Sequence, residues 1–273
     1  MQILFGFLIA LGISLTAYRT GSLSLGGCLA ATGLGTVVFG LGGVGWAALL
    51  IVFFVSSSIL SRLFGQRKQR LGEKFSKGSR RDAAQVLANG GVAGLLVLFR
   101  IWLPESEWLW VGFAGSMAAV NADTWATEMG TLSWSAPRLI TSGETVEPGT
   151  SGGITLFGTL ASLSGAFLIA VLFGLFTASG AGFSSPGTAM TAVGVICAAG
   201  LGGSMFDSLL GATLQAMYRC PACAQDTERH PAHSCGSPTS LVRGWRWLNN
   251  DYVNAGCALV GALAAIGLSY WLL

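Results

Sequence analysis

Long apolar runs dominate the chain, and polar residues gather in the segments between them. Most runs approach the roughly 20 residues that an α-helix needs to cross a bilayer. None alternates polar with apolar positions, as the strands of a membrane β-barrel do. The pattern predicts an all-α fold, a polytopic integral membrane helical bundle of about eight transmembrane helices in a single domain, residues 1–273. The runs cover residues 2–18, 22–42, 45–62, 83–103, 108–121, 154–177, 188–206 and 255–273.

Two of these assignments depend on short signals. Only Gly42, Gly43 and Gly45 mark the break between the second and third runs. The first run lacks a basic leading segment and a small-residue cleavage site, so we expect a retained span instead of a signal peptide.

Composition supports a membrane protein and excludes several other classes. Of the 273 residues, 52% are hydrophobic and 10% are charged, whereas a soluble domain carries about 25% charged residues. So few charged residues cannot cover the water-facing surface that a soluble protein of this length would have. It excludes an ordinary soluble enzyme, a disordered chain and a secreted disulfide scaffold.

The basic residues predict how the helices are oriented. Residues 62–81 contain only one acid, Glu73, so the positive-inside rule makes this segment a cytoplasmic loop. Alternating spans then place the segments 122–153 and 216–250 on the cytoplasmic side and both termini outside the cytoplasm. Eight of the fifteen Lys and Arg residues lie in this basic loop: Arg62, Arg67, Lys68, Arg70, Lys74, Lys77, Arg80 and Arg81.

Five of the twelve acids lie at or just beyond the cytoplasmic ends of four predicted spans: Asp82, Asp123, Glu128, Asp207 and Asp251. Helical spacing gives them polar neighbours, because Asn89 shares a face with Asp82, Asn121 with Glu128, and Asn254 with Asp251. Acids at membrane depth are costly and indicate a functional site. Each acid and its polar neighbours form a polar stripe along one helix face. An interhelical hydrogen bond or a helix cap would explain any single stripe, but together the stripes predict a polar chamber open to the cytoplasm.

A glycine-rich turn precedes the sixth run, in the segment EPGTSGG. Converging backbone N–H groups at such a turn can bind an anion, although Thr150 or Ser151 acting as a helix N-cap explains the turn equally well. The lysine of a Walker A loop is absent. The residues that could hold phosphates here are Lys77, Arg81, Arg138, Gly149, Thr150, Ser151, Gly152 and Gly153.

The segment RCPACAQDTERHPAHSCG brings three cysteines and two histidines together. Three thiolates and one imidazole form a tetrahedral zinc set in which no coordination position stays open, so the metal would be structural. His233 is preferred to His230 because it leaves a longer, less strained loop after Cys223. An unmetallated or redox loop is the alternative, and a cytoplasmic location disfavours a disulfide. The predicted zinc ligands are Cys220, Cys223, His233 and Cys235.

Five motifs carry a resemblance to a known family. They are KGSRRDAAQVLANGG (77–91), NADTWATEMG (121–130), PRLITSGETVEPGTSGG (137–153), FDSLLGATLQ (206–215) and WLNNDYVN (247–254). With them the chain resembles the membrane family that includes plant phytyl-phosphate kinase of tocopherol biosynthesis and animal transmembrane protein 19. The resemblance implies phosphoryl transfer from a nucleoside triphosphate, CTP in particular, to an isoprenyl monophosphate, giving the diphosphate.

Side-chain chemistry, placed on these motifs, suggests roles in such a reaction. Asp123, Glu128, Asp207 and Asp251 would be catalytic, and Asp123, Asp207 and Asp251 would bind Mg²⁺. We expect membrane lipids as partners and no nucleic acid. The expected phosphate and nucleotide residues are Lys77, Arg81, Asn89, Asn121, Arg138, Gly149, Thr150, Ser151, Gly152, Gly153 and Asn254.

Two other functions fit polar helix ends of this kind. One is a lipid or small-molecule transporter or flippase, and the other is CTP-dependent nucleotidyl transfer to a lipid phosphate. A transporter needs polar residues through the whole membrane depth. The outer halves of the predicted spans offer few beyond Arg100, Glu105 and Glu107, which favours the kinase.

Overall fold

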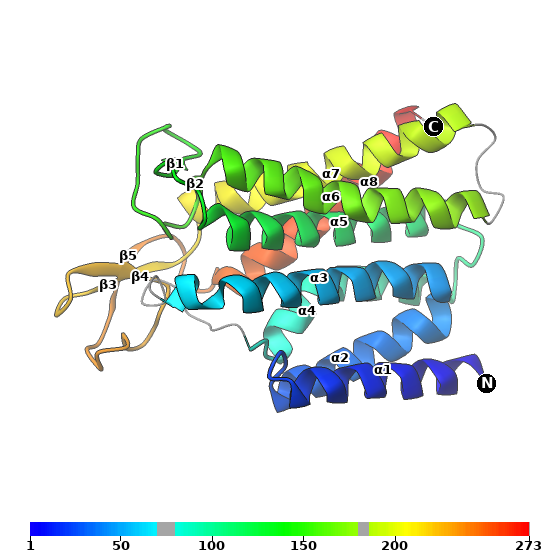
Figure 1. Cartoon of the computed structure of the whole chain (residues 1–273), viewed down its shortest axis with the longest axis horizontal. Helices are drawn as coiled ribbons and strands as arrows, with labels where there is room; N and C mark the ends of the chain where they lie inside the picture. The colour runs from blue at the N-terminus through cyan, green and yellow to red at the C-terminus, as the bar shows by residue number, and fades with distance from the viewer. Residues whose placement is uncertain (70–79, 180–185, 273) are drawn as a thin grey trace.

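The computed structural model describes residues 1–69, 80–179 and 186–272, which form a bundle of α-helices with short strands gathered at one end (Figure 1). The helices are α1 Gln2–Arg19, α2 Leu25–Val37, α3 Val44–Gln69, α4 Ala83–Phe99, α5 Glu107–Gly130, α6 Leu156–Ser179, α7 Pro186–Thr213 and α8 Asn250–Leu272. Six of the described helices are long and apolar enough to cross a membrane, and α4 is a shorter apolar helix. The predicted polytopic helical fold is confirmed, with eight as an approximate count of spans.

The glycine break between the second and third runs is a tight turn. Helix α2 continues as a π-helical turn, η1 Val38–Gly42, before the chain reverses into α3. Gly43 adopts φ +85°, in the left-handed region that disfavours other residues. The weak sequence signal at Gly42–Gly45 therefore marks the boundary between two helices.

Helices extend into segments expected to be loops. Helix α5 continues past residue 121 to Gly130, so the first part of the expected loop 122–153 is helical, and α3 continues to Gln69 inside the basic segment 62–81. Residues 70–79 of that segment lie outside the described residues. Polar side chains on one face do not end a helix, and no proline or glycine interrupts residues 121–129.

The five short strands formed by the described residues lie at the end of the bundle opposite both chain termini (Figure 1). β1 Arg138–Leu139 pairs antiparallel with β2 Gly153–Ile154. The segment 216–250 holds a three-stranded antiparallel sheet in the order β4-β3-β5. Its strands are β3 Met217–Cys220, β4 Gln225–Thr227 and β5 Ser240–Arg243.

Helix α5 runs through the centre of the bundle and packs against α6, α7 and α8 through small residues. A Cβ atom added at Gly115 would overlap the carbonyl oxygen of Gly261 on α8, and one added at Gly203 on α7 would lie 2.5 Å from the Cβ of Ala119. Small residues of this kind let membrane helices approach closely, where packing replaces the hydrophobic effect as the driving force.

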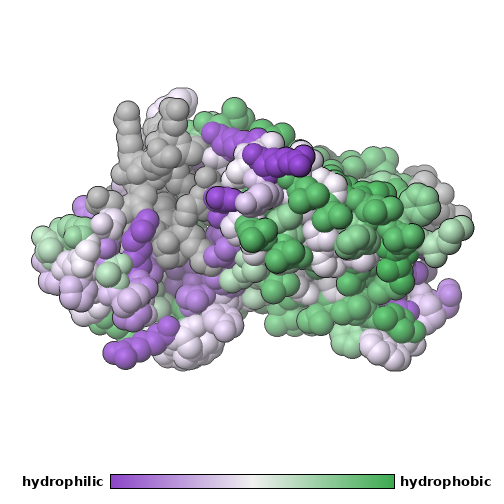
Figure 2. Space-filling model, turned by 90° about the horizontal axis from the view of Figure 1, so that it is seen from below, coloured by the Kyte–Doolittle hydropathy of each residue, from purple (hydrophilic) through white to green (hydrophobic). Residues whose placement is uncertain are grey.

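The outer surface separates into an apolar helical part and a polar end (Figure 2). Large apolar side chains point outward from several helices; Leu29 is 68% exposed, Leu175 62% and Met190 77%. Such exposure is unfavourable in water but suits contact with lipid. Hydrophilic residues gather towards the end that carries the strands.

We expect the contact between α5 and α8 to tolerate no added methyl group. In Gly261→Ala the new Cβ would lie 2.5 Å from Ala119 Cβ and 2.6 Å from the Gly115 carbonyl oxygen. Overpacking of this kind costs about 1–3 kcal/mol, so the melting temperature of the detergent-solubilised protein should fall. Gly267→Ala, on the same helix with no atom near the new Cβ, is the matched control. Equal melting temperatures for the two variants would contradict the packing described here.

Candidate active site

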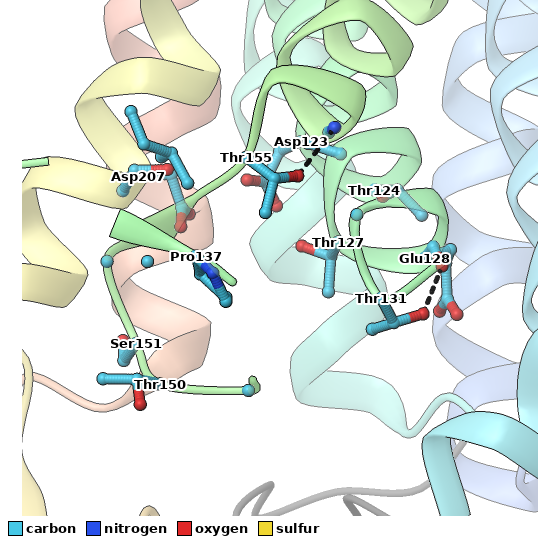
Figure 3. Close-up of a pocket in the computed structure, with 18 of the residues that line it drawn as sticks. Asp123, Thr124, Thr127, Glu128, Thr131, Pro137, Thr150, Ser151, Thr155 and Asp207 are labelled. Carbon is cyan, nitrogen blue, oxygen red and sulfur yellow. Dashed lines mark hydrogen bonds between the residues drawn. The ribbon is translucent and has the colours of Figure 1, made fainter. Parts of the chain in front are cut away.

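A polar cavity of about 270 Å³ lies at the strand end of the bundle (Figure 3). Its walls come from the start of α4, the last turns of α5, the C-terminal part of α7, the start of α8 and the segment between α5 and α6. The polar stripes that the sequence predicts to share one chamber therefore line a single cavity. Of the predicted site residues, the lining includes Arg81, Asn89, Asp123, Glu128, Gly149, Thr150, Ser151, Gly152, Gly153, Asp207 and Asn254.

Helix α5 supplies a ladder of polar side chains. Asp123, Thr127 and Thr131 follow one another at intervals of four residues, so they lie on one face, with Thr124 and Glu128 beside them (Figure 3). Thr131 Oγ1 donates a hydrogen bond to the Glu128 carbonyl oxygen at 2.8 Å. The ladder exists because α5 continues beyond its apolar part.

Glu128 joins α5 to α3. Its side chain is buried, and Oε1 accepts a hydrogen bond of 2.7 Å from Ser61 Oγ. One carboxylate oxygen therefore has a structural partner, so Glu128 lines the cavity and also fixes its wall.

Asp207 of α7 presents its carboxylate from the opposite wall (Figure 3), and the Oδ2 atom of this half-buried residue is shielded from solvent. Asp123 and Glu228 are close enough to interact with it electrostatically. Within the described part of the chain, Asp207 Oδ2 has no hydrogen-bond partner. A buried carboxylate oxygen without a donor suits a cation ligand, because an uncompensated buried charge is costly.

Arg81 places a positive charge at the edge of the cavity, just before α4. Its guanidinium donates to Ser58 Oγ at 3.4 Å and lies over the rings of Phe53 and Phe54, 5.7 and 5.6 Å from their centroids. Burial lowers the pKa of Arg81 to about 10, and the nearby charge of Glu128 acts in the opposite direction. Arg81 therefore stays protonated at neutral pH.

The glycine-rich turn packs directly on α7. Gly149 and Gly152 both have positive φ, +82° and +83°, and a Cβ at Gly152 would lie 2.5 Å from the backbone of Ala212. Ser151 Oγ donates a 2.8 Å hydrogen bond to Gln215 Oε1, and Gln215 Nε2 donates a 2.8 Å bond to Glu228 Oε1. The turn is therefore tied to the end of α7 and to the segment after β4.

The helix after this turn is not capped by Thr150 or Ser151. The short strand β2 intervenes, and Thr155 Oγ1 accepts the N–H of Gly158 at 3.0 Å at the start of α6 (Figure 3). Capping therefore does not explain the glycine-rich turn, because a different residue caps the helix.

Three of the expected residues that the structure describes do not line the cavity. Asn121 is fully buried; it donates to the Gly165 carbonyl oxygen and accepts from Ser56 Oγ, which ties α5 to α6 and α3. Arg138 is exposed on β1 and donates to the Gly143 carbonyl oxygen at 3.0 Å.

Asp251 lies in the first turn of α8, where its N–H bonds to Asn249 Oδ1 at 3.0 Å, but α8 lines the cavity through Asn250 and Asn254. Lys77 lies outside the described residues.

Several lining residues, among them Ser61, Thr155 and Glu228, were not predicted as site residues from the sequence. Ser61 carried a signal, because the serines at 56–58 and 61 form a polar cluster at the end of the third apolar run. Thr155 and Glu228 reach the cavity through the folding of connecting segments, for which the sequence gives no periodic pattern.

The cysteine segment folds into the predicted ligand cluster. Cys220 ends β3, and the ligand atoms of Cys220, Cys223, His233 and Cys235 all lie within 4.8 Å of one another. His230 lies apart, with its ring stacked on Tyr218 at 4.5 Å between centroids. The structure therefore favours His233 as the fourth ligand.

The distances in this cluster suit a tetrahedral metal site. Cys220 Sγ lies 3.6 Å from Cys235 Sγ, and His233 Nδ1 lies 3.4 Å from Cys235 Sγ and 3.6 Å from Cys223 Sγ. Zinc bonded to sulfur at about 2.3 Å and to nitrogen at about 2.0–2.1 Å places neighbouring ligand atoms roughly 3.5–3.8 Å apart. The cluster could hold a metal ion, and its donor set is compatible with zinc.

Comparison with known proteins gives relatives along most of the chain. The family model for integral membrane protein DUF92 matches residues 8–262. Protein PGR of Arabidopsis thaliana is 36% identical over 230 residues, which cover 78% of this chain and 79% of the relative. An uncharacterized membrane protein of Methanocaldococcus jannaschii is 33% identical, covering 79% of this chain and 84% of its own length.

A further relative is Protein VTE6, chloroplastic, of Arabidopsis thaliana, which is 28% identical over 255 residues. The alignment covers 92% of this chain and 66% of the relative. No solved structure matches the chain.

We expect the purified protein to contain about one Zn²⁺ per chain. Cys220→Ser should lose this metal and lower the melting temperature, because a structural zinc site contributes directly to folding free energy. Cys197→Ser, in α7 and outside the cluster, is the matched control and should keep the metal. Elemental analysis that finds no zinc in the wild type, or equal zinc in both variants, would exclude the site.

Proposed function

Since the chain belongs to the integral membrane family DUF92, we propose that it is a membrane isoprenyl-phosphate kinase. It would transfer a phosphoryl group from a nucleoside triphosphate, CTP in particular, to an isoprenyl monophosphate. The observation that carries this proposal is the cavity at the polar end of the bundle, which carboxylates of α5 and α7 line together with a half-buried arginine and a glycine-rich turn. Phosphoryl transfer needs such a set, because it depends on positioning and on stabilising charge.

The motifs support the same proposal. Four of the five motifs that resemble the phytyl-phosphate kinase family contribute several residues to the cavity lining, and the fifth contributes Asn250 and Asn254. The site thus draws on segments from residue 81 to residue 254.

The phosphate groups would lie between Arg81 and the turn 149–153. Arg81 is a fixed, protonated donor at one edge, and from the other edge the turn would offer the Thr150 hydroxyl and the N–H groups of Ser151 and Gly152. The Ser151 hydroxyl donates to Gln215 and holds the turn in place. Asn89 and Asn254 offer amide donors from α4 and α8. These residues hold donor and acceptor phosphates in place.

Asp123 and Asp207 would hold Mg²⁺. Hard carboxylate oxygens suit this ion, which usually binds one or two carboxylates together with substrate phosphates. The buried Asp207 Oδ2, without a hydrogen-bond donor in the described structure, fits a cation nearby. When bound, Mg²⁺ neutralises negative charge that develops on the transferred phosphoryl group. Asp251 lies outside the cavity lining and is left out of this set.

The proposed reaction balances without a strong base. An oxygen of the ionised acceptor phosphate attacks the γ-phosphorus of the donor, the bond from γ-phosphorus to the bridging oxygen breaks, and the nucleoside diphosphate leaves. The acceptor has no proton that must be removed first. The protein side chains therefore act by orienting the two phosphates and by stabilising charge.

The orientation of the bundle also belongs to the proposal, because a soluble nucleotide must reach the cavity from the cytoplasm. The basic residues near the strand end support this orientation. A tag at the C-terminus, which lies at the opposite end (Figure 1), should then be accessible only from outside the cytoplasm. A tag that is labelled in the cytoplasm of intact cells would reverse the orientation.

Asp123→Asn should lower the rate of diphosphate formation by at least about 100-fold. The substitution removes a charge beside Asp207 but keeps the size of the side chain. The measurement is conversion of phytyl, farnesyl or geranylgeranyl monophosphate with CTP or ATP and Mg²⁺. Asp226→Asn is the control, because Asp226 is exposed and pairs with Arg219 at 3.2 Å outside the cavity.

Two results would contradict this proposal. One is a wild-type protein that forms no diphosphate with any donor and acceptor pair. The other is full activity in Asp123→Asn, at a melting temperature equal to that of the wild type.

A further inference from the structure

A second cavity, of about 70 Å³, lies among α1, α2, α3 and α4. Its walls are almost entirely apolar, in contrast to those of the first cavity. Among the residues that line it are Ala10, Ala31, Leu34, Phe39, Leu50 and Phe54. The proposed phosphate chemistry uses none of these six residues.

The two cavities meet at three polar residues. Arg81, Gln85 and Asn89 line both of them. Gln85 and Asn89 are one helical turn apart on α4, and Asn89 Nδ2 donates to the Gln85 carbonyl oxygen at 2.9 Å. A ligand that filled both spaces would therefore place a polar group beside Arg81 and an apolar chain among the first four helices.

Arg81 is held firmly at this junction. Its backbone N–H donates to the Ser22 carbonyl oxygen, and its own carbonyl oxygen accepts the Ser24 N–H, both at 2.9 Å. Its guanidinium lies over Phe53 and Phe54, which line the apolar cavity. The charged group thus faces the polar cavity from a fixed position at the entrance of the apolar one.

Small residues create the apolar space. Ala10, Ala31 and Gly90 lie on its walls, where larger side chains would fill it. The lining runs from Ala31 on α2 to Phe39 on η1, which corresponds to roughly 12 Å along the helices. A space of this volume encloses a segment of an extended hydrocarbon chain and leaves the rest of the chain outside it.

We propose that this apolar cavity binds the part of the lipid monophosphate's hydrocarbon chain that lies next to its phosphate, with the phosphate beside Arg81. The identity of the head group rests on the proposed function, whereas the site for the chain rests on the shared lining of the two cavities. Lipid tails are as apolar as leucine side chains, so moving the chain from bilayer to cavity gains little from the hydrophobic effect. The cavity acts chiefly by positioning the acceptor phosphate.

The test uses an isoprenyl monophosphate with a diazirine on the part of its chain nearest the phosphate, photolysed on the purified protein without nucleotide. Labelling should map to the cavity walls in α1–α4. Ala31→Leu fills the space and should lower this labelling at least several-fold. Ala198→Leu, on an exposed position of α7, is the matched control and should leave it unchanged.

Competition identifies the ligand. Excess unlabelled isoprenyl monophosphate should displace the probe, and excess phosphatidylcholine should not. Equal displacement by phosphatidylcholine, labelling spread over the outer surfaces of α6 and α8, or unchanged labelling in a folded Ala31→Leu variant would overturn the proposal.

A second variant keeps the proposal testable if Ala31→Leu does not fold. In Ala31→Cys, bound isoprenyl monophosphate should slow alkylation of the new thiol, and an unchanged rate would overturn the proposal. Both measurements omit the nucleotide. Retained labelling in a protein that forms no diphosphate would refute the kinase but keep the lipid site.

Discussion

The site depends on the close approach of α5, α7 and α8 through glycine and alanine. In a bilayer each helix satisfies its own backbone hydrogen bonds, so the helices associate through packing. Ala119 on α5, Gly203 on α7 and Gly261 on α8 meet at one level of the bundle. Asp123 and Asp207 follow Ala119 and Gly203 by one turn, so the contact that joins α5 and α7 also brings their carboxylates together.

The antiparallel α8 completes the same arrangement. This helix begins at the strand end of the bundle, so Asn254, two turns before Gly261, lies at the level of the cavity. The segment after α7 then closes the cavity, because Ser151, Gln215 and Glu228 form a continuous line of hydrogen bonds. Glu228 follows β4, in the same small sheet whose strand β3 ends at Cys220, so the cysteine cluster and one wall of the cavity are connected through this sheet.

The sequence predicted those features that follow a regular pattern. Continuous apolar runs predicted the eight α-helices that the described residues form. Because charge is scarce, Asp123, Glu128 and Asp207 stood out as candidates for one polar chamber, and all three line the cavity. Ligand spacing gave the cysteine cluster with His233. Periodicity shows which residues share a face but not which neighbour that face meets, so Asn121 was expected in the cavity, whereas it ties α5 to α3 and α6.

Features that depend on how the connecting segments fold were harder to predict from the sequence. Arg138 has the charge for phosphate binding, but pairing of β1 with β2 leaves it exposed, and Thr155 caps α6 in place of the two candidates in the turn. The family membership was predicted correctly from motifs that lie at helix ends and in the segment between α5 and α6, because the identity of the residues there carries information that periodicity does not.

The account rests on transfer of the terminal phosphoryl group of a nucleoside triphosphate to a lipid monophosphate. The most direct measurement compares CTP labelled at the γ-phosphate with CTP labelled at the α-phosphate, each incubated with the purified protein, Mg²⁺ and an isoprenyl monophosphate. The account predicts label in an isoprenyl diphosphate from the γ-position and none from the α-position. Label from the α-position in the lipid product would instead indicate nucleotidyl transfer and would contradict the account.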